Sequence, residues 1–104
     1  MIFPGSAPPA GGGSAAMYIV YSIYNYKHNK IYVGQTVDLT SRLLMHNNHT
    51  FKGYTSQFDG IWEVIYKEEV KTRIDALKRE KQLKSYQGRK FIKQFIDYSR
   101  VAQR

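Results

Sequence analysis

The order of hydrophobic and polar positions predicts a β-hairpin at the start of the folded part of the chain. Nearly all residues in 18–24 are β-branched or aromatic, which is typical of a buried strand, and residues 30–33 resume this character. The polar segment 25–29 between them predicts a loop of about five residues. Because side chains alternate along a strand, Tyr21 is expected to share one face with Ile19 and Ile23.

A third strand is predicted further along, after a long polar segment. Residues 61–67 are mostly β-branched or aromatic and predict a strand with Trp62, Val64 and Tyr66 on one face. The segment 47–60 before it has no hydrophobic period and many turn-forming residues, which predicts a long loop. Loops of that length in small domains tend to be functional.

Hydrophobic spacing typical of α-helices predicts three helices. The first is expected to be capped by Thr36 or Asp38. The second follows a T-x-x-D capping signature that begins at Thr72 and is expected to end near residue 85. Gly88 is expected to break the helix, and a last helix is expected over 89–98. The hydrophobic stripe predicted for the second helix consists of Ile74, Ala76, Leu77 and Leu83.

The two ends of the chain differ in composition from its middle. Residues 1–16 combine three prolines with glycines and small residues, so we expect a disordered leader or tag. Residues 17–98 are expected to form one domain, and residues 99–104 a frayed tail. No uninterrupted apolar run approaches the roughly 18 residues of a membrane span, so we expect a soluble, cytoplasmic protein without membrane contact.

Charge adds a candidate partner to this outline. The net charge is +8, and no charged residue occurs in 1–16. The basic residues are densest in 71–93, which favours a basic face toward a polyanion such as DNA, although a solvated helix surface would have the same composition. The candidate nucleic-acid contacts are Lys52, Lys78, Lys81, Lys84 and Arg89. The chain has no cysteine, so a metal ion would need oxygen or imidazole ligands.

Four side chains around the hairpin and the first helix suit phosphate chemistry. Tyr21 and Tyr32 lie on the two hairpin strands, and Arg42 and His46 are four residues apart, on one side of the predicted helix. Two phenols, a guanidinium and an imidazole can therefore converge. The spacing of the helical pair fits an exposed arginine and a histidine favoured by the helix dipole equally well.

Two further positions need an explanation. Glu80 falls on the hydrophobic stripe of the second helix, where a carboxylate is costly unless it is paired, protonated or bound to a cation. A salt bridge to Arg42 or a lysine, or metal ligation, would each satisfy it. Gly34 ends the hairpin, where it is expected to let backbone approach a ligand or to adopt a positive φ.

These residues together resemble the GIY-YIG nuclease family. The matching segments are Ile19-Val20-Tyr21, then Tyr32-Val33-Gly34, then Arg42 and His46, and then Glu80 within L-K-R-E-K-Q-L-K. The pattern is most similar to small stand-alone bacterial members related to the UvrC-type repair nuclease domain. Residues 19 and 20 depart from the Gly-Ile of the family motif, and no asparagine follows Glu80, whereas many members carry one.

The resemblance implies an α+β fold, a small three-stranded antiparallel sheet flanked by helices. It also implies a DNA endonuclease that hydrolyses phosphodiester bonds with one Mg²⁺ or Mn²⁺ ion, in DNA repair or recombination. By position, Tyr21 would act as the general base and Tyr32 would orient water or phosphate. Arg42 would stabilise the transition state with His46 beside it, and Glu80 would bind the metal. Tyr54 falls where many members place a further histidine or tyrosine near the scissile phosphate.

Other functions remain open at this point. Basic charge and stacking tyrosines also suit a nucleic-acid-binding module with vestigial cleavage, and an RNA-processing or scaffolding role fits the same composition. For a nuclease, specificity for branched or structured DNA would come from the loops of the domain, from a homo-oligomer or from a partner protein.

Overall fold

The structure is a computed structural model that describes residues 17–48 and 53–98. Its elements in order are β1 (Tyr18–Asn25), β2 (Lys30–Thr36), α1 (Leu39–Asn47), the 3-10 helix η1 (Tyr54–Gln57), β3 (Trp62–Val70), α2 (Arg73–Lys84) and α3 (Tyr86–Lys93). The strands form one antiparallel sheet in the order β2-β1-β3. The expected α+β class with a small antiparallel sheet and flanking helices is confirmed. The expected leader and tail lie outside the described residues.

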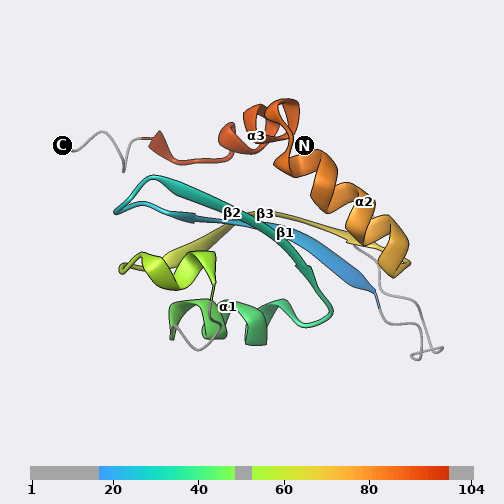
Figure 1. Ribbon diagram of the computed structural model, residues 1–104, viewed down its shortest axis with the longest axis horizontal. Coiled ribbons are helices and arrows are strands. Elements are labelled where there is room, and N and C mark those ends of the chain that lie inside the picture. The colour runs from blue at the N-terminus through green and yellow to red at the C-terminus, as the bar shows by residue number, and fades with distance from the viewer. Residues whose placement is uncertain (1–16, 49–52, 99–104) are drawn as a thin grey trace.

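The sheet is the middle of three layers. Helices α2 and α3 cover one face, and α1 with η1 covers the other (Figure 1). The core on the α2–α3 side contains Val20, Val33, Tyr66, Ala76, Leu83 and Ile92. The core on the α1 side contains Tyr21, Ile23 and Trp62. Every described helix is too short to cross a membrane.

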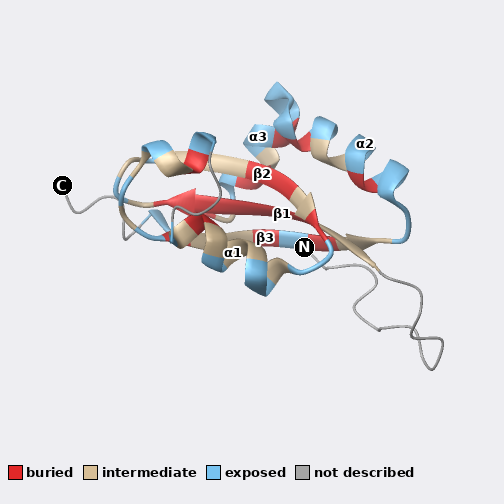
Figure 2. Cartoon of the chain, turned by 60° about the horizontal axis from the view of Figure 1, so that its bottom comes forward, coloured by how far each residue is buried: buried red, intermediate tan, exposed pale blue. Residues whose placement is uncertain are grey.

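The central strand β1 is buried on both faces. Residues 20–25 are all fully buried, and β1 is the most continuously buried element (Figure 2). The four-residue connection to β2 is shorter than the predicted loop and places Asn29 at a positive φ of 56°. Because both faces of β1 meet packed layers, a polar side chain on this strand can pair only with groups inside the protein.

The third strand departs from the predicted alternation. Ser22 pairs with Tyr66 and Ile23 with Val64, so Ile65 is an extra residue in a β-bulge. Trp62 and Val64 therefore pack on the α1 side, whereas Tyr66 packs on the α2–α3 side. The prediction that these three residues share a face is wrong, because one inserted residue reverses the alternation.

The first two helices begin where their capping residues predict. Asp38 accepts a hydrogen bond from the Ser41 backbone N–H at 3.1 Å, and Thr72 accepts one from the Asp75 backbone N–H at 3.0 Å. Thr36 instead holds the turn by accepting from the Asp38 backbone N–H at 3.2 Å.

The predicted hydrophobic stripe of α2 is only half right. Ala76 and Leu83 are buried, but Ile74 and Leu77 are 66% and 45% exposed. The face toward the sheet runs through Ala76, Glu80 and Leu83, which are spaced by four and three residues. The helix turns Arg79 and Glu80 toward the sheet, because Arg79 forms an ion pair with Glu68 on β3.

The break between the last two helices occurs at Ser85. Ser85 has extended backbone angles (φ −72°, ψ 171°), and its hydroxyl accepts a hydrogen bond from the Gly88 backbone N–H at 3.2 Å. Gly88 lies buried inside α3, where a Cβ atom would stand 2.2 Å from the carbonyl oxygen of Gln82. The prediction that Gly88 breaks the helix and that the last helix spans 89–98 is therefore wrong. The glycine lets α3 approach the end of α2.

A buried polar network fastens α2 to the sheet. Glu68 on β3 is only 8% exposed. Its carboxylate accepts hydrogen bonds from the Tyr66 hydroxyl and, at 2.8 Å, from Arg79 Nε. Arg79 in turn donates to Gln82 at 3.0 Å. Arg79 and Glu80 are adjacent on α2, so the network that holds Arg79 also sets the position of Glu80 relative to the sheet.

We expect Glu68→Ala to lower the free energy of unfolding by about 2–3 kcal/mol, because it leaves the Tyr66 hydroxyl and the Arg79 guanidinium without their shared acceptor. Chemical denaturation measures this change. Glu69→Ala on the same strand is the matched control, with an expected change within about 0.5 kcal/mol. Equal losses in the two variants would show that the network does not stabilise the fold.

Candidate active site

The hairpin brings two tyrosines together around Gly34. Tyr21 on β1 pairs with Gly34 on β2, and the Tyr21 and Tyr32 ring centroids are 6.2 Å apart. A Cβ atom on Gly34 would stand 2.8 Å from the Tyr21 hydroxyl and 2.9 Å from the Tyr32 ring. Among the described glycines, positive φ values occur at Gly53 and Gly60 and not at Gly34, so the alternative of a positive φ at Gly34 is wrong. Gly34 makes room for the tyrosine hydroxyl.

His46 joins this pair through a buried hydrogen-bond chain. It is fully buried, with Nε2 at 3.0 Å from the Tyr21 hydroxyl and Nδ1 at 2.8 Å from the Thr55 hydroxyl. A neutral imidazole has one donor and one acceptor, so both nitrogens are satisfied by these two hydroxyls. The alternative of an exposed arginine and a helix-terminal histidine is wrong for the arginine, because Arg42 is half-buried; His46 does lie in the last turn of α1, but it is buried against the sheet.

The surroundings keep both members of the Tyr21–His46 pair uncharged at neutral pH. Burial, and then the positive charge of Arg42, lowers the pKa of His46 to about 4. Burial, and then the neighbouring Tyr32, raises the pKa of Tyr21 well above its usual range, while Arg42 opposes this rise. The phenol therefore carries its proton, and the neutral imidazole carries a lone pair that can accept a hydrogen bond.

Arg42 lies within electrostatic reach of the whole cluster. It is half-buried on α1, one turn before His46. Its positive charge partly offsets the rise that burial causes in the pKa values of Tyr21 and Tyr32, and it adds to the lowering that burial causes in the pKa of His46. The structure thus brings together the two tyrosines, the arginine and the histidine that the sequence suggested.

Glu80 reaches the cluster from the other face of the sheet. Its negative charge raises the pKa of both Tyr21 and Tyr32. Of the partners considered from the sequence, the ion pair forms with a lysine: Lys84 Nζ lies 2.9 Å from Glu80 Oε2. The Glu80 side chain is 19% exposed, so solvent reaches part of it.

The donor set fits a hard divalent cation with few protein ligands. The described residues contain no group of three or more acidic or histidine side chains that could hold a metal. Mg²⁺ keeps several waters and is commonly bound by one or two carboxylates together with substrate phosphates. Glu80 provides one such carboxylate, and its oxygen donors suit Mg²⁺ or Mn²⁺.

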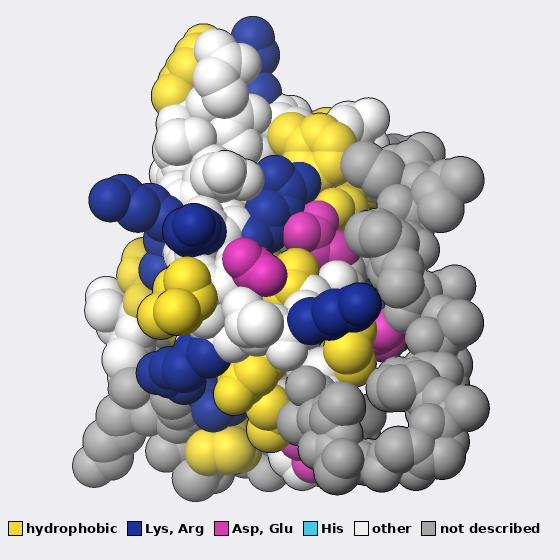
Figure 3. All heavy atoms as spheres, turned by 90° about the vertical axis from the view of Figure 1, so that its right-hand side faces the viewer, with side chains coloured by type: hydrophobic (Ala, Val, Ile, Leu, Met, Phe, Trp, Pro, Cys, Tyr) yellow, Lys and Arg dark blue, Asp and Glu magenta, His cyan; other side chains and the backbone are white. Residues whose placement is uncertain are grey.

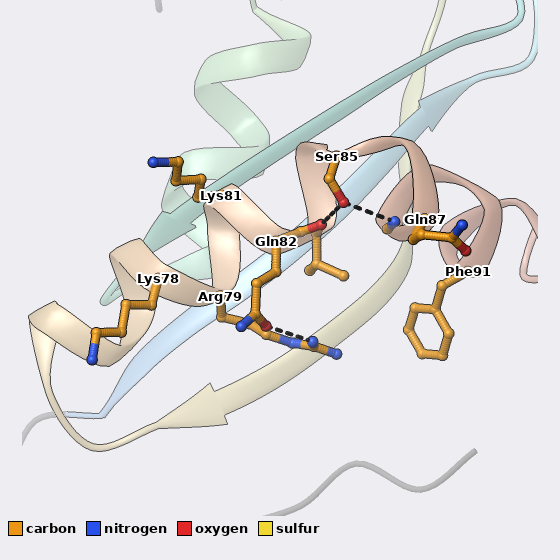
Figure 4. Close-up of a pocket in the computed structure, with 9 residues that line it drawn as sticks. Lys78, Arg79, Lys81, Gln82, Ser85, Gln87 and Phe91 are labelled. Carbon is orange, nitrogen blue, oxygen red and sulfur yellow. Dashed lines mark hydrogen bonds between the residues drawn. The ribbon is translucent and has the colours of Figure 1, made fainter.

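The candidate DNA contacts fall into two separate groups. Lys84 and Arg89 line a cavity of about 310 Å³ together with Tyr32 and Tyr54. Lys78 and Lys81 border a different cavity of about 710 Å³ between α2 and α3. Figure 4 shows these two lysines extending outward, whereas Arg79 bends back toward Gln82. Lys52 and His49 lie outside the described residues.

Basic side chains do not form one continuous stripe on the end of the molecule that faces right in Figure 1. In Figure 3 they stand in separate groups among acidic and hydrophobic side chains. Among the candidates that the structure describes, Lys84 and Arg89 line a cavity with Tyr32 and Tyr54, whereas Lys78 and Lys81 border another cavity.

Thr55 is the site residue that sequence reasoning missed. It is 1% exposed and lies in η1, within the segment predicted as an irregular loop. A threonine in a polar segment has no spacing relative to His46 that would single it out. Its role depends on the fold of that segment over the end of α1.

The fold and the tyrosine–histidine–arginine cluster define a small catalytic domain of the GIY-YIG type. Residues 17–93 match the GIY-YIG catalytic domain family, and the chain belongs to it. This membership implies a nuclease-type function.

Relatives of similar size occur in staphylococci. A UPF0213 protein of Staphylococcus saprophyticus is 31% identical over 71 residues, which cover 68% of this chain and 85% of the relative. A UPF0213 protein of Staphylococcus epidermidis is 33% identical over 73 residues, which cover 68% and 88%. No solved structure matches the chain significantly.

The depressed pKa of His46 predicts a specific loss of stability in weak acid. The folded state resists protonation down to about pH 4, whereas an unfolded histidine takes up its proton near 6.5. The stabilisation is complete above about pH 6.5 and declines as pH falls toward 4, by up to about 3 kcal/mol. Denaturant unfolding at pH 5 to 8 measures it, and His46→Gln should remove this part of the pH dependence. An identical pH profile in the variant would show that His46 is not held neutral by the fold.

Proposed function

We propose that this protein is a divalent-metal-dependent DNA endonuclease that hydrolyses phosphodiester bonds, with a setting in DNA repair or recombination. The observation that carries the proposal is the buried hydrogen-bond chain from Tyr21 through His46 to Thr55, with the charges of Arg42 and Glu80 acting on its phenol. A buried phenol with a proton acceptor behind it and a cation beside it suits activation of a water molecule against a phosphate.

The proton path follows from the charge states of the pair. Because the Tyr21 phenol is protonated, its oxygen gains a proton from the attacking water only as it releases its own proton to His46 Nε2, 3.0 Å away. In the tautomer whose Nδ1–H donates to the Thr55 hydroxyl, the Nε2 lone pair is directed at Tyr21 and can receive the proton.

Charge stabilisation is assigned to Arg42 and Glu80. Phosphoryl transfer needs mainly positioning and neutralisation of charge on the non-bridging oxygens, which the Arg42 guanidinium provides from α1. Tyr32 borders both the cluster and the cavity, where its hydroxyl can orient the phosphate. Glu80 is the ligand for Mg²⁺ or Mn²⁺, which when bound supplies further positive charge at the phosphate.

We expect Tyr21→Phe to lose most cleavage activity while it keeps DNA affinity. The phenyl ring still fills its place in the core, and only the hydroxyl is removed, so unfolding should become easier by only about 1 kcal/mol. Cleavage of plasmid and oligonucleotide DNA with Mg²⁺ or EDTA, together with a binding assay, measures both properties. Turnover near that of the native chain would transfer the proton-accepting role elsewhere. DNA binding by the native chain without any Mg²⁺-dependent cleavage would favour a binding module.

We expect Lys84→Met to strengthen binding of Mn²⁺ in the absence of DNA. The Lys84 ammonium lies 2.9 Å from Oε2 of the Glu80 carboxylate, so it competes with a cation for that carboxylate. A gain of about twofold to fivefold in affinity corresponds to the 0.5–1 kcal/mol typical of a partly exposed ion pair.

Isothermal titration calorimetry measures this affinity. Lys81→Met serves as the control, because Lys81 lies one residue from Glu80 in sequence but borders the other cavity. Glu80→Gln should abolish the binding. Weaker Mn²⁺ binding by Lys84→Met would mean that Lys84 supports the metal site instead of competing for it.

A further inference from the structure

The cavity of about 310 Å³ lies at the free edge of the sheet, beside Tyr32. Its walls are Ile31, Tyr32 and Val33 of β2, Tyr54 of η1, Lys84 of α2 and Arg89 of α3. The helices from the two faces of the sheet thus close around the edge strand. Because Tyr32 borders both this cavity and the Tyr21 cluster, a ligand in the cavity is adjacent to the reacting phosphate.

Tyr54 gives the cavity an exposed aromatic wall. Its ring is nearly parallel to that of Tyr32, at 19° with 6.4 Å between centroids, and it is 42% exposed. Phe58 braces it from the side at 5.2 Å, edge to face. A ring that is held in place and left open on one side is the arrangement on which proteins stack single nucleobases.

Lys84 and Arg89 add two cationic side chains to the wall of the same cavity. Both are exposed, and the Lys84 charge is the largest charge effect on the Tyr32 phenol, whose pKa it lowers against the effect of burial. A cavity lined by an aromatic ring and two cations is suited to a nucleotide, because the base can stack while phosphate groups meet the ammonium and guanidinium groups.

We propose that this cavity is a subsite for one unpaired nucleotide of DNA next to the scissile phosphate. The inference rests on the nuclease function proposed above. The volume is at the lower end of the range for small-ligand pockets, which suits one nucleotide rather than a base pair. A base in a duplex is stacked on both faces, so it reaches Tyr54 only after it leaves the helix. The substrate class is therefore DNA with a single-stranded stretch at the cleavage point.

The test compares three DNAs of one sequence: a blunt duplex, a splayed fork and the single strand. Fluorescence anisotropy in EDTA measures their affinities without cleavage. We expect the native chain to prefer the fork and the single strand over the duplex by about tenfold, the contribution of one stacked base. Tyr54→Leu should lose this preference and keep its duplex affinity, whereas Tyr54→Phe should retain it.

Tyr86→Leu is the matched control, because Tyr86 is 73% exposed on α3 and is not part of the cavity wall. It should behave as the native chain. As a second readout, 2-aminopurine placed at successive positions of the single strand should be quenched at one position by the native chain and not by Tyr54→Leu.

Two results overturn the inference while the nuclease function stands, provided that the native chain cleaves DNA with Mg²⁺. In the first, Tyr54→Leu keeps an undiminished preference for the single strand. In the second, the native chain itself prefers the blunt duplex. Absence of binding to any of the three DNAs would overturn both the inference and the proposed function.

Discussion

The Tyr21 hydroxyl and His46 Nε2 meet at 3.0 Å in a part of the core where both side chains are fully buried. That contact depends on β1 being covered on both faces. If α1 did not close over the sheet, water would solvate the imidazole and its pKa would return toward the ordinary value. The layer that completes the fold on this side is also what gives the site its charge states.

The second requirement is that α2 reaches the same site from the opposite face. Ala76 and Leu83 pack against the sheet, and the Glu68–Arg79 ion pair sets the rotation of the helix about its axis. With Arg79 held, Glu80 is brought toward the edge of β2 and toward the tyrosines. A site at the edge of a sheet can thus combine side chains from both faces, and it remains open to a polymer that runs past that edge.

The sequence predicted most elements and the central cluster, because strand composition, capping residues and ordered motifs are local signals. It failed where a non-local contact decides the outcome. The bulge at Ile65 reverses the side on which Tyr66 packs, and the buried partner of Arg79 turns Ile74 and Leu77 outward. Thr55 could not be found, because its contact with His46 depends on how a segment without periodicity folds over α1.

The uncharged resting state of the tyrosine–histidine pair constrains when the site is able to act. A phenol with a raised pKa and an imidazole with a lowered one exchange a proton only if nearby charge changes. Lys84 now neutralises Glu80, so the charge balance beside Tyr32 shifts when that ion pair opens. Under the proposed function, a DNA phosphate in the cavity would offer Lys84 an alternative anion, and a divalent cation could then take the place of Lys84 at Glu80. Nucleic acid and metal would in that case favour each other's binding through one ammonium group.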